Sequence, residues 1–200
     1  MQTIFPIVYA GNIHYYSHLK NASSFVFDKH EHYIKQTYRN RCSIYGANGK
    51  LDLIIPVEKG SHGHRAVQDV KISYADHWQR MHWKSLESAY RSSPYFEYYE
   101  HEFIGFYEKK IEYLVEYNLL FQEKLVKLLD LEIKPAFTQK YEIANENFED
   151  ARVLGDPLNE IPEEKFNHYT QVFESKLGFI PNLSIIDLLV NCGPESLGIL

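Results

Sequence analysis

The densest group of chemically useful side chains lies in the stretch DKHEHYIKQTYRNR, residues 28–41. Arginine presents a planar fork of donors that matches a carboxylate or a phosphate, and a neighbouring asparagine adds a directional amide. Lys35, Arg39 and Arg41 would project together from an extended segment, with Asn40 between the two arginines. These residues predict an anion-binding site. The alternative is that an arginine pairs with an acidic residue of a long helix.

Histidines in two places are candidates for metal binding or proton transfer. His30 and His32 would share one face of an extended segment, and Asp28 could complete a metal site with them. His62 and His64 flank a glycine whose freedom would let both imidazoles reach one centre. No further ligand stands at a metal-type spacing. At both places the alternative is therefore a solvated loop.

The stretch HWQRMHWKSLESAYRSS has the spacing of a helix that carries an indole and an imidazole on one face. On such a helix Trp78 and His82 are four residues apart and face the same side. Trp78 or Tyr90 could stack on a sugar or a base, while His82 served as general base. The alternative is a core tryptophan beside a satisfied core histidine. Nucleotide-binding, nucleophile-elbow and metalloprotease motifs do not occur, and the sequence does not identify a cofactor.

The elements that must position these groups begin with a strand–helix–strand unit. TIFPIVYAG and SSFVFD read as short strands on either side of a helix that Asn12 caps. Asn48-Gly49 then predicts a hairpin in which both turn residues have positive φ. A strand through Val70 and Ile72 is expected to follow.

Helical patterns dominate the remainder of the chain. Residues 76–92 form one helix and residues 96–130 form one long or two abutting helices, while Ser184 caps a final helix that Gly193-Pro194 ends. The prediction is an α/β fold in a single domain over residues 1–200. A small mixed sheet, made of the N-terminal unit and the hairpin, is covered by the helix-rich central and C-terminal parts.

The composition limits the class of protein. The net charge of -6 argues against a nucleic-acid-binding surface, and no apolar stretch has the length of a membrane span. Two cysteines are too few for a disulfide scaffold, and no signal peptide is recognisable, so a cytoplasmic protein is expected. Aromatic residues make up 15% of the chain, and the sixteen tyrosines should line clefts or half-buried seams.

Four motifs in order resemble the WbqC-like protein family, particularly its Bacteroidetes branch. They are FVFDKHEHYIKQTYRNRCSI, the NGKLDLIIPVEK hairpin, HWQRMHWKSLESAYRSSPYFEYY and the closing YTQVFESKLGFIPNLSIIDLLVNCGPES. By this resemblance three groups of residues fall on family motifs. They are Tyr33, Lys35, Asn40 and Arg41 after the second strand, Trp78, His82, Tyr90 and Pro94 on the central helix, and Ser184, Asp187 and Asn191 on the final helix.

The resemblance implies an enzyme of bacterial surface-polysaccharide biosynthesis that transfers an acyl or aminoacyl group to an activated amino sugar. A nucleotide-sugar would be the small-molecule substrate. His82 and Asp187 are the catalytic candidates, and Arg41, His82 and Asp187 are expected to converge on one cavity. A nucleotidylyl-transferase-like enzyme and a non-catalytic accessory protein of glycan assembly are the alternatives. Oligomeric state is left open.

Overall fold

A computed structural model describes residues 2–60, 65–143, 148–158 and 166–200, and it confirms the α/β class. The predicted strand–helix–strand unit is present as β1 (Gln2–Pro6), α1 (Ile13–Asn21) and β2 (Phe25–Asp28). β1 lies between β2 and β5 (Phe148–Asp150), and both neighbours run parallel to it. The carboxyl ends of three strands therefore meet at one edge of this sheet.

The hairpin forms a second sheet of β3 (Arg41–Gly46) and β4 (Gly49–Ile54), so the strands are divided between two sheets. Its turn differs from the prediction. Gly46 pairs with Gly49, which makes Ala47 and Asn48 the turn residues, and only Gly49 has positive φ, at 109°. A turn whose two central residues keep negative φ, followed by one left-handed glycine, also reverses a hairpin.

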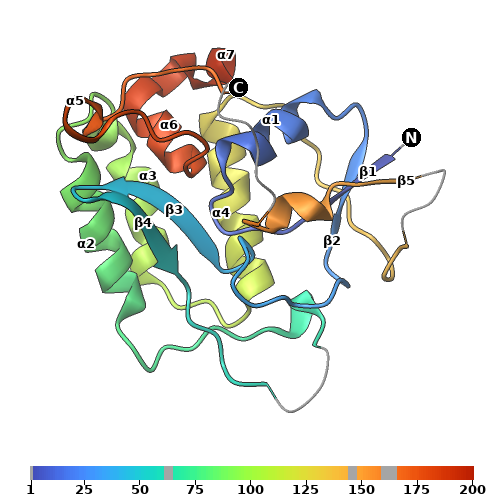
Figure 1. The fold of residues 1–200 in the computed structure, drawn as a ribbon. Helices are drawn as coiled ribbons and strands as arrows, with labels where there is room; N and C mark the ends of the chain where they lie inside the picture. Colours follow the sequence, from blue (N-terminus) through green and yellow to red (C-terminus); the bar gives the residue numbers. More distant parts are fainter. Residues whose placement is uncertain (1, 61–64, 144–147, 159–165) are drawn as a thin grey trace.

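Three long helices follow the hairpin: α2 (Trp78–Tyr90), α3 (Phe96–Glu108) and α4 (Leu114–Leu128). The helical pattern over residues 96–130 is thus two helices. α4 runs between the hairpin with α2 on one side and the parallel sheet on the other (Figure 1). Instead of the strand expected through Val70 and Ile72, a 3₁₀ turn, η1 (Val67–Asp69), leads to an isolated bridge between Ile72 and Val57.

The C-terminal part contributes η2 (Arg152–Gly155), α5 (Glu174–Leu177), α6 (Ile185–Cys192), η4 (Gly193–Glu195) and α7 (Ser196–Ile199). Ser184 caps α6 as predicted, because its Oγ accepts from the amide of Ile186 at 3.3 Å. Across the ranges that the structure describes, none of the helices combines the length and the apolarity that crossing a membrane requires.

Tyrosine supplies much of the interior. The sequence predicts half-buried tyrosines, but several are fully covered, and most of these are held by hydroxyl contacts inside the protein. Tyr15, for example, donates to Pro6 O at 2.9 Å, and Tyr45 donates to Gly178 O at 2.6 Å. Such contacts repay the desolvation of each hydroxyl. The fully covered rings are Tyr9, Tyr15, Tyr16, Tyr45, Tyr90 and Tyr117.

Gly193 should tolerate no side chain. Its φ is 55°, and an added Cβ would lie 2.5 Å from the ring of Tyr95. With a ψ of -129°, this backbone conformation is sparsely populated by residues that have a Cβ and costs them about 1–3 kcal/mol. We expect Gly193→Ala to lower the free energy of unfolding, measured by urea denaturation, by about 2 kcal/mol or more. Gly198→Ala is the control, because a Cβ there meets nothing within 4 Å; equal stability of the two variants would contradict this expectation.

Candidate functional site

The first turn of α1 is the place where a strand–helix–strand unit often binds a phosphate. The first three backbone amides of α1 all donate to oxygens of the protein. Ile13 N donates to Leu183 O at 3.0 Å, His14 N to Asn182 Oδ1 at 3.0 Å, and Tyr15 N to Asn12 Oδ1 at 2.9 Å. This helix end is therefore closed to an anion. The arrangement counts against the nucleotidylyl-transferase-like alternative.

Charged side chains converge at the carboxyl ends of the parallel strands, where ligands bind in open α/β sheets. Asp28, at the end of β2, is fully buried and accepts from Arg152 Nη1 at 2.7 Å and from Thr138 Oγ1 at 2.9 Å. Arg152 also donates twice to Asp150 of β5, at 2.8 and 2.7 Å. One guanidinium thus hydrogen-bonds to two carboxylates and ties the two outer strands together.

Arg39 is used entirely inside the protein. Its Nε donates to Glu31 Oε1 at 2.8 Å, its Nη2 bonds to the other carboxylate oxygen, and its Nη1 contacts Thr37 at 3.3 Å. Both charged partners are buried, at 2% and 4% exposure. Burial raises the pKa of Glu31, and the hydrogen bonds from Arg39 oppose that rise. A Cβ on Gly155 would lie only 3.0 Å from Arg39 Nη1, so this guanidinium is also enclosed sterically.

Arg41, the first residue of β3, is in a different position. Its side chain is 21% exposed, and its Nη1 reaches Asp52 Oδ2 at 3.4 Å. Asp52, 38% exposed, accepts from Ser43 Oγ at 2.7 Å. Within the described ranges, the buried Nε of Arg41 has no partner. The long contact with Asp52 is the only hydrogen bond that the guanidinium makes within the described ranges, and the side chain is partly exposed, so Arg41 keeps terminal donors that a ligand could use.

Tyr33 lies within the electrostatic reach of this guanidinium, and Arg65 lies beside Tyr33. The amide of Tyr33 donates to Arg65 O at 2.8 Å, and the Arg65 guanidinium lies 5.9 Å from the centroid of the Tyr33 ring. Burial raises the pKa of Tyr33, while the positive charges of Arg65, Arg39 and Arg41 act against that rise. We call Tyr33, Arg41, Ser43, Asp52 and Arg65 the Arg41 site.

The other predicted anion ligands of the 28–41 segment do not join Arg41. Residues 35–40 form turns, with φ of 61° at Gln36, so an alternating pattern does not apply to them. Lys35 is exposed. Asn40 closes the base of the hairpin: its side-chain amide donates to Ile55 O at 2.8 Å, and its carbonyl accepts from Ile55 N at 2.8 Å.

His82 is buried among aromatic rings. Its Nδ1 lies 3.2 Å from Tyr9 Oη and its Nε2 lies 3.2 Å from Ile54 O. Because a carbonyl only accepts, Nε2 carries the proton and Nδ1 accepts from Tyr9, whose oxygen is also 2.9 Å from Tyr107 Oη. Burial lowers the pKa of His82 to about 4. Trp78, 2% exposed, meets His82 edge-on at 5.0 Å and offers no open face for stacking.

His82 and Arg41 approach the same part of the hairpin from opposite faces. Arg41 pairs with Ile54, whose carbonyl contacts His82. Successive strand side chains alternate, so Arg41 shares its face with Ser43, while buried Cys42 contacts Tyr9, the partner of His82. The two groups therefore do not line the shared cavity that the sequence predicts.

Asp187 belongs to a third group of polar contacts. The carboxylate is fully buried and accepts from Tyr90 Oη (2.7 Å), Tyr169 Oη (2.6 Å) and Gln171 Nε2 (3.1 Å). Burial raises the pKa of Asp187, and these three donors oppose the rise. Tyr90 follows His82 by eight residues, or about 12 Å along α2. His82 and Asp187 therefore occupy separate networks.

The described residues contain no cluster of three or more ligands that could hold a metal ion. Both oxygens of Asp28 are engaged, one by Arg152 and the other by Thr138 and the amide of His30 at 2.9 Å. His62 and His64 lie outside the described residues.

Several important residues were not singled out from the sequence. Glu31 and Arg152 occur in polar stretches where many carboxylates and cations look equivalent, and only the fold pairs them. Asp52 had a visible signal, because it interrupts the apolar strand LDLII on the face that also carries Arg41. Tyr9 gave none, since a tyrosine after a buried strand is usually a packing residue.

These features define an α/β protein with a partly exposed arginine site at the hairpin and paired buried charges at the carboxyl edge of a parallel sheet. The WbqC-like protein family model matches residues 8–156 and 158–199, and the chain belongs to this family. It is 22% identical over 209 residues to "Uncharacterized protein Rv1507c" of Mycobacterium tuberculosis, covering 91% of this chain and 89% of that protein. No solved structure matches.

The buried imidazole should make stability depend on pH. In the unfolded chain His82 has the ordinary pKa of 6.5, whereas in the folded protein its pKa is about 4. The contribution of neutral His82 to the free energy of unfolding is therefore fully present above pH 6.5. It is lost as the pH falls from 6.5 to about 4, by on the order of 3 kcal/mol. His82→Gln should flatten the dependence in urea titrations at several pH values. An imidazole that titrates near 6.5 by NMR would contradict this account.

Proposed function

We propose that the Arg41 site binds the phosphate or carboxylate group of a small substrate. The supporting observation is the partly exposed side chain of Arg41, whose guanidinium makes a single hydrogen bond within the described ranges, the 3.4 Å contact with Asp52. A nearby charged oxygen would form shorter, stronger hydrogen bonds with this group. Arg65 adds positive charge beside Tyr33.

The reaction in this proposal is the transfer of an acyl or aminoacyl group to an activated amino sugar during bacterial surface-polysaccharide biosynthesis. Membership of the family supports the biosynthetic context. The resemblance of the four motifs together supports the Bacteroidetes branch. The chemistry is supported by the pairing of a cation with a carboxylate in one site. Arg41 would hold the phosphates of a nucleotide-sugar, and Asp52 would accept a proton from the sugar amine.

The other predicted site residues have positioning roles in this proposal. Arg39 and Asn40 fix the turn that leads into Arg41, through Glu31 and Ile55 respectively. His82 and Trp78 support the opposite face of the hairpin. Asp187, through Tyr90, holds the far end of β3, because Tyr90 Oη also accepts from Tyr45 N at 3.0 Å.

Calorimetric titration with UDP-linked amino sugars, pyrophosphate and glycine tests the binding step. We expect one phosphate-containing compound to bind the wild type and Arg41→Ala to weaken that binding by about 10- to 100-fold, the value of a hydrogen bond to a charged group. Arg91→Ala is the matched control, because Arg91, at the end of α2, pairs with Glu87 of the same helix and with Glu100 of α3 and not with the hairpin. Its affinity should equal that of the wild type.

Equal loss in both arginine variants, or binding unaffected by Arg41→Ala, would contradict the proposed site. Mass spectrometry of the sugar after incubation with acyl and aminoacyl donors tests the reaction. Asp52→Asn should keep binding and lose product formation. If the wild type binds the sugar and no donor yields product, the non-catalytic accessory role is favoured over the transferase.

A further inference from the structure

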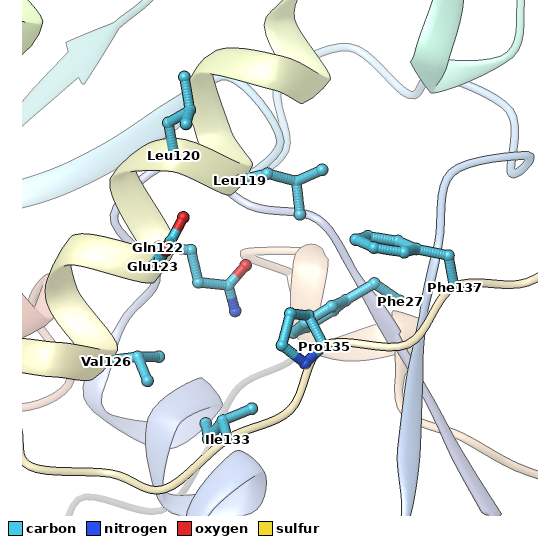
Figure 2. A pocket seen from close by; sticks show the side chains of 9 residues that line it. All are labelled: Phe27, Leu119, Leu120, Gln122, Glu123, Val126, Ile133, Pro135 and Phe137. Carbon is cyan, nitrogen blue, oxygen red and sulfur yellow. The ribbon is translucent and has the colours of Figure 1, made fainter.

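An apolar cleft lies beside α4, apart from the Arg41 site (Figure 2). It has a volume of about 160 Å³. Its walls come from α4, from the end of β2 and from the segment that follows α4. The residues that form these walls are Phe27, Leu119, Val126, Ile133, Pro135 and Phe137. The cleft shares none of its lining residues with the Arg41 site.

The wall opposite α4 is anchored at both ends. Leu131 N–H donates to Val126 O at 3.0 Å just after the helix ends. Further along, Ala136 O accepts from Phe27 N at 2.8 Å, and Thr138 N donates to Phe27 O at 3.0 Å. The intervening segment therefore spans the gap between α4 and β2. Because its two ends are held by backbone hydrogen bonds, this segment forms one wall of the cleft.

The floor carries one polar side chain with an unused acceptor. Gln122 is only 4% exposed, and its Nε2 donates to Tyr15 Oη at 3.1 Å. Tyr15 uses its single proton on Pro6 O at 2.9 Å, so it must accept from Gln122, and this fixes the orientation of the amide. Gln122 Oε1 is buried and has no partner within the described ranges. Figure 2 shows the amide reaching from α4 into the cleft.

A buried acceptor left without a donor costs about 1–3 kcal/mol. An ordered water repays such a cost poorly in this cleft, because buried waters typically make about three hydrogen bonds and these walls are apolar. A ligand with an apolar body and one hydrogen-bond donor would pack against the apolar walls and donate to Gln122 Oε1. A cavity of about 150 Å³ is known to hold benzene, so a single substituted ring has the right size.

We infer that this cleft is a binding site for a small, mostly apolar compound that carries one N–H or O–H donor, which it gives to Gln122 Oε1. Glu123, an exposed carboxylate among the lining residues, disfavours carboxylates and other anions. The ligand class is therefore different from the anionic substrate of the Arg41 site. The site goes beyond the proposed transferase function and does not depend on it.

Ligand-observed NMR and competition titrations with p-cresol, toluene and p-toluate test this site in the full chain. These three compounds share a ring and a methyl group and differ in the polar substituent. We expect p-cresol to bind about tenfold more tightly than toluene, because only p-cresol satisfies the buried acceptor. We expect p-toluate not to bind. Absence of p-cresol binding up to its solubility limit, or equal affinity for p-cresol and toluene, would overturn the inference.

Two variants separate the site from non-specific binding. Gln122→Leu should abolish the preference for p-cresol over toluene while keeping toluene affinity. Val126→Phe should fill the cleft and remove binding of both compounds, whereas Val115→Phe, on the same helix outside the cleft, is the matched control. A cresol preference that survives Gln122→Leu would overturn the proposed role of Oε1. Binding that survives in a folded Val126→Phe protein would overturn the location.

Discussion

Paired charges buried at the carboxyl ends of the parallel strands are the interaction on which the arrangement of the candidate site depends. Asp28 and Glu31 are covered by protein, and their ion pairs with Arg152 and Arg39 offset the cost of burying the carboxyl groups. The Arg152 pair connects β2 to the segment after β5. The Arg39 pair folds residues 31–39 into a closed turn. That turn delivers the chain to the start of β3, where Arg41 faces outward.

Polar networks also connect elements in the rest of the described interior, although some buried polar atoms there have no partner. Tyr9 and Tyr107 contact His82 and each other, while Tyr90 and Tyr169 donate to Asp187. Each network joins α2 to a segment distant in the sequence. Hydrogen bonds of this kind are directional, so they select one packing among the many that would bury the same aromatic area. The exceptions, such as Gln122 Oε1, are for that reason informative.

Local pattern was enough to predict most of the elements. The caps at Asn12 and Ser184, the strand–helix–strand unit and the hairpin depend on a few neighbouring residues, and all are present. The sequence pattern could not predict which side chains pair with one another in ion pairs and hydrogen bonds. Arg39 and Arg41 look equivalent in the sequence, yet Arg39 is enclosed and Arg41 is partly exposed. The difference comes from residues distant in the chain, such as Gly155, which lies against Arg39. His82 and Asp187 are residue types that often act in catalysis, but here both are buried and hydrogen-bonded to neighbouring groups of the protein.

A double-mutant cycle on Glu31 and Arg39 tests most directly whether this buried pair organises the site. Glu31→Gln, Arg39→Gln and the double variant would be compared with the wild type by urea denaturation. Because removal of either partner leaves the other charge buried alone, we expect each single change to cost about 3–5 kcal/mol, with a coupling free energy of about 2 kcal/mol or more. Additive losses, with no coupling between the two positions, would contradict the account.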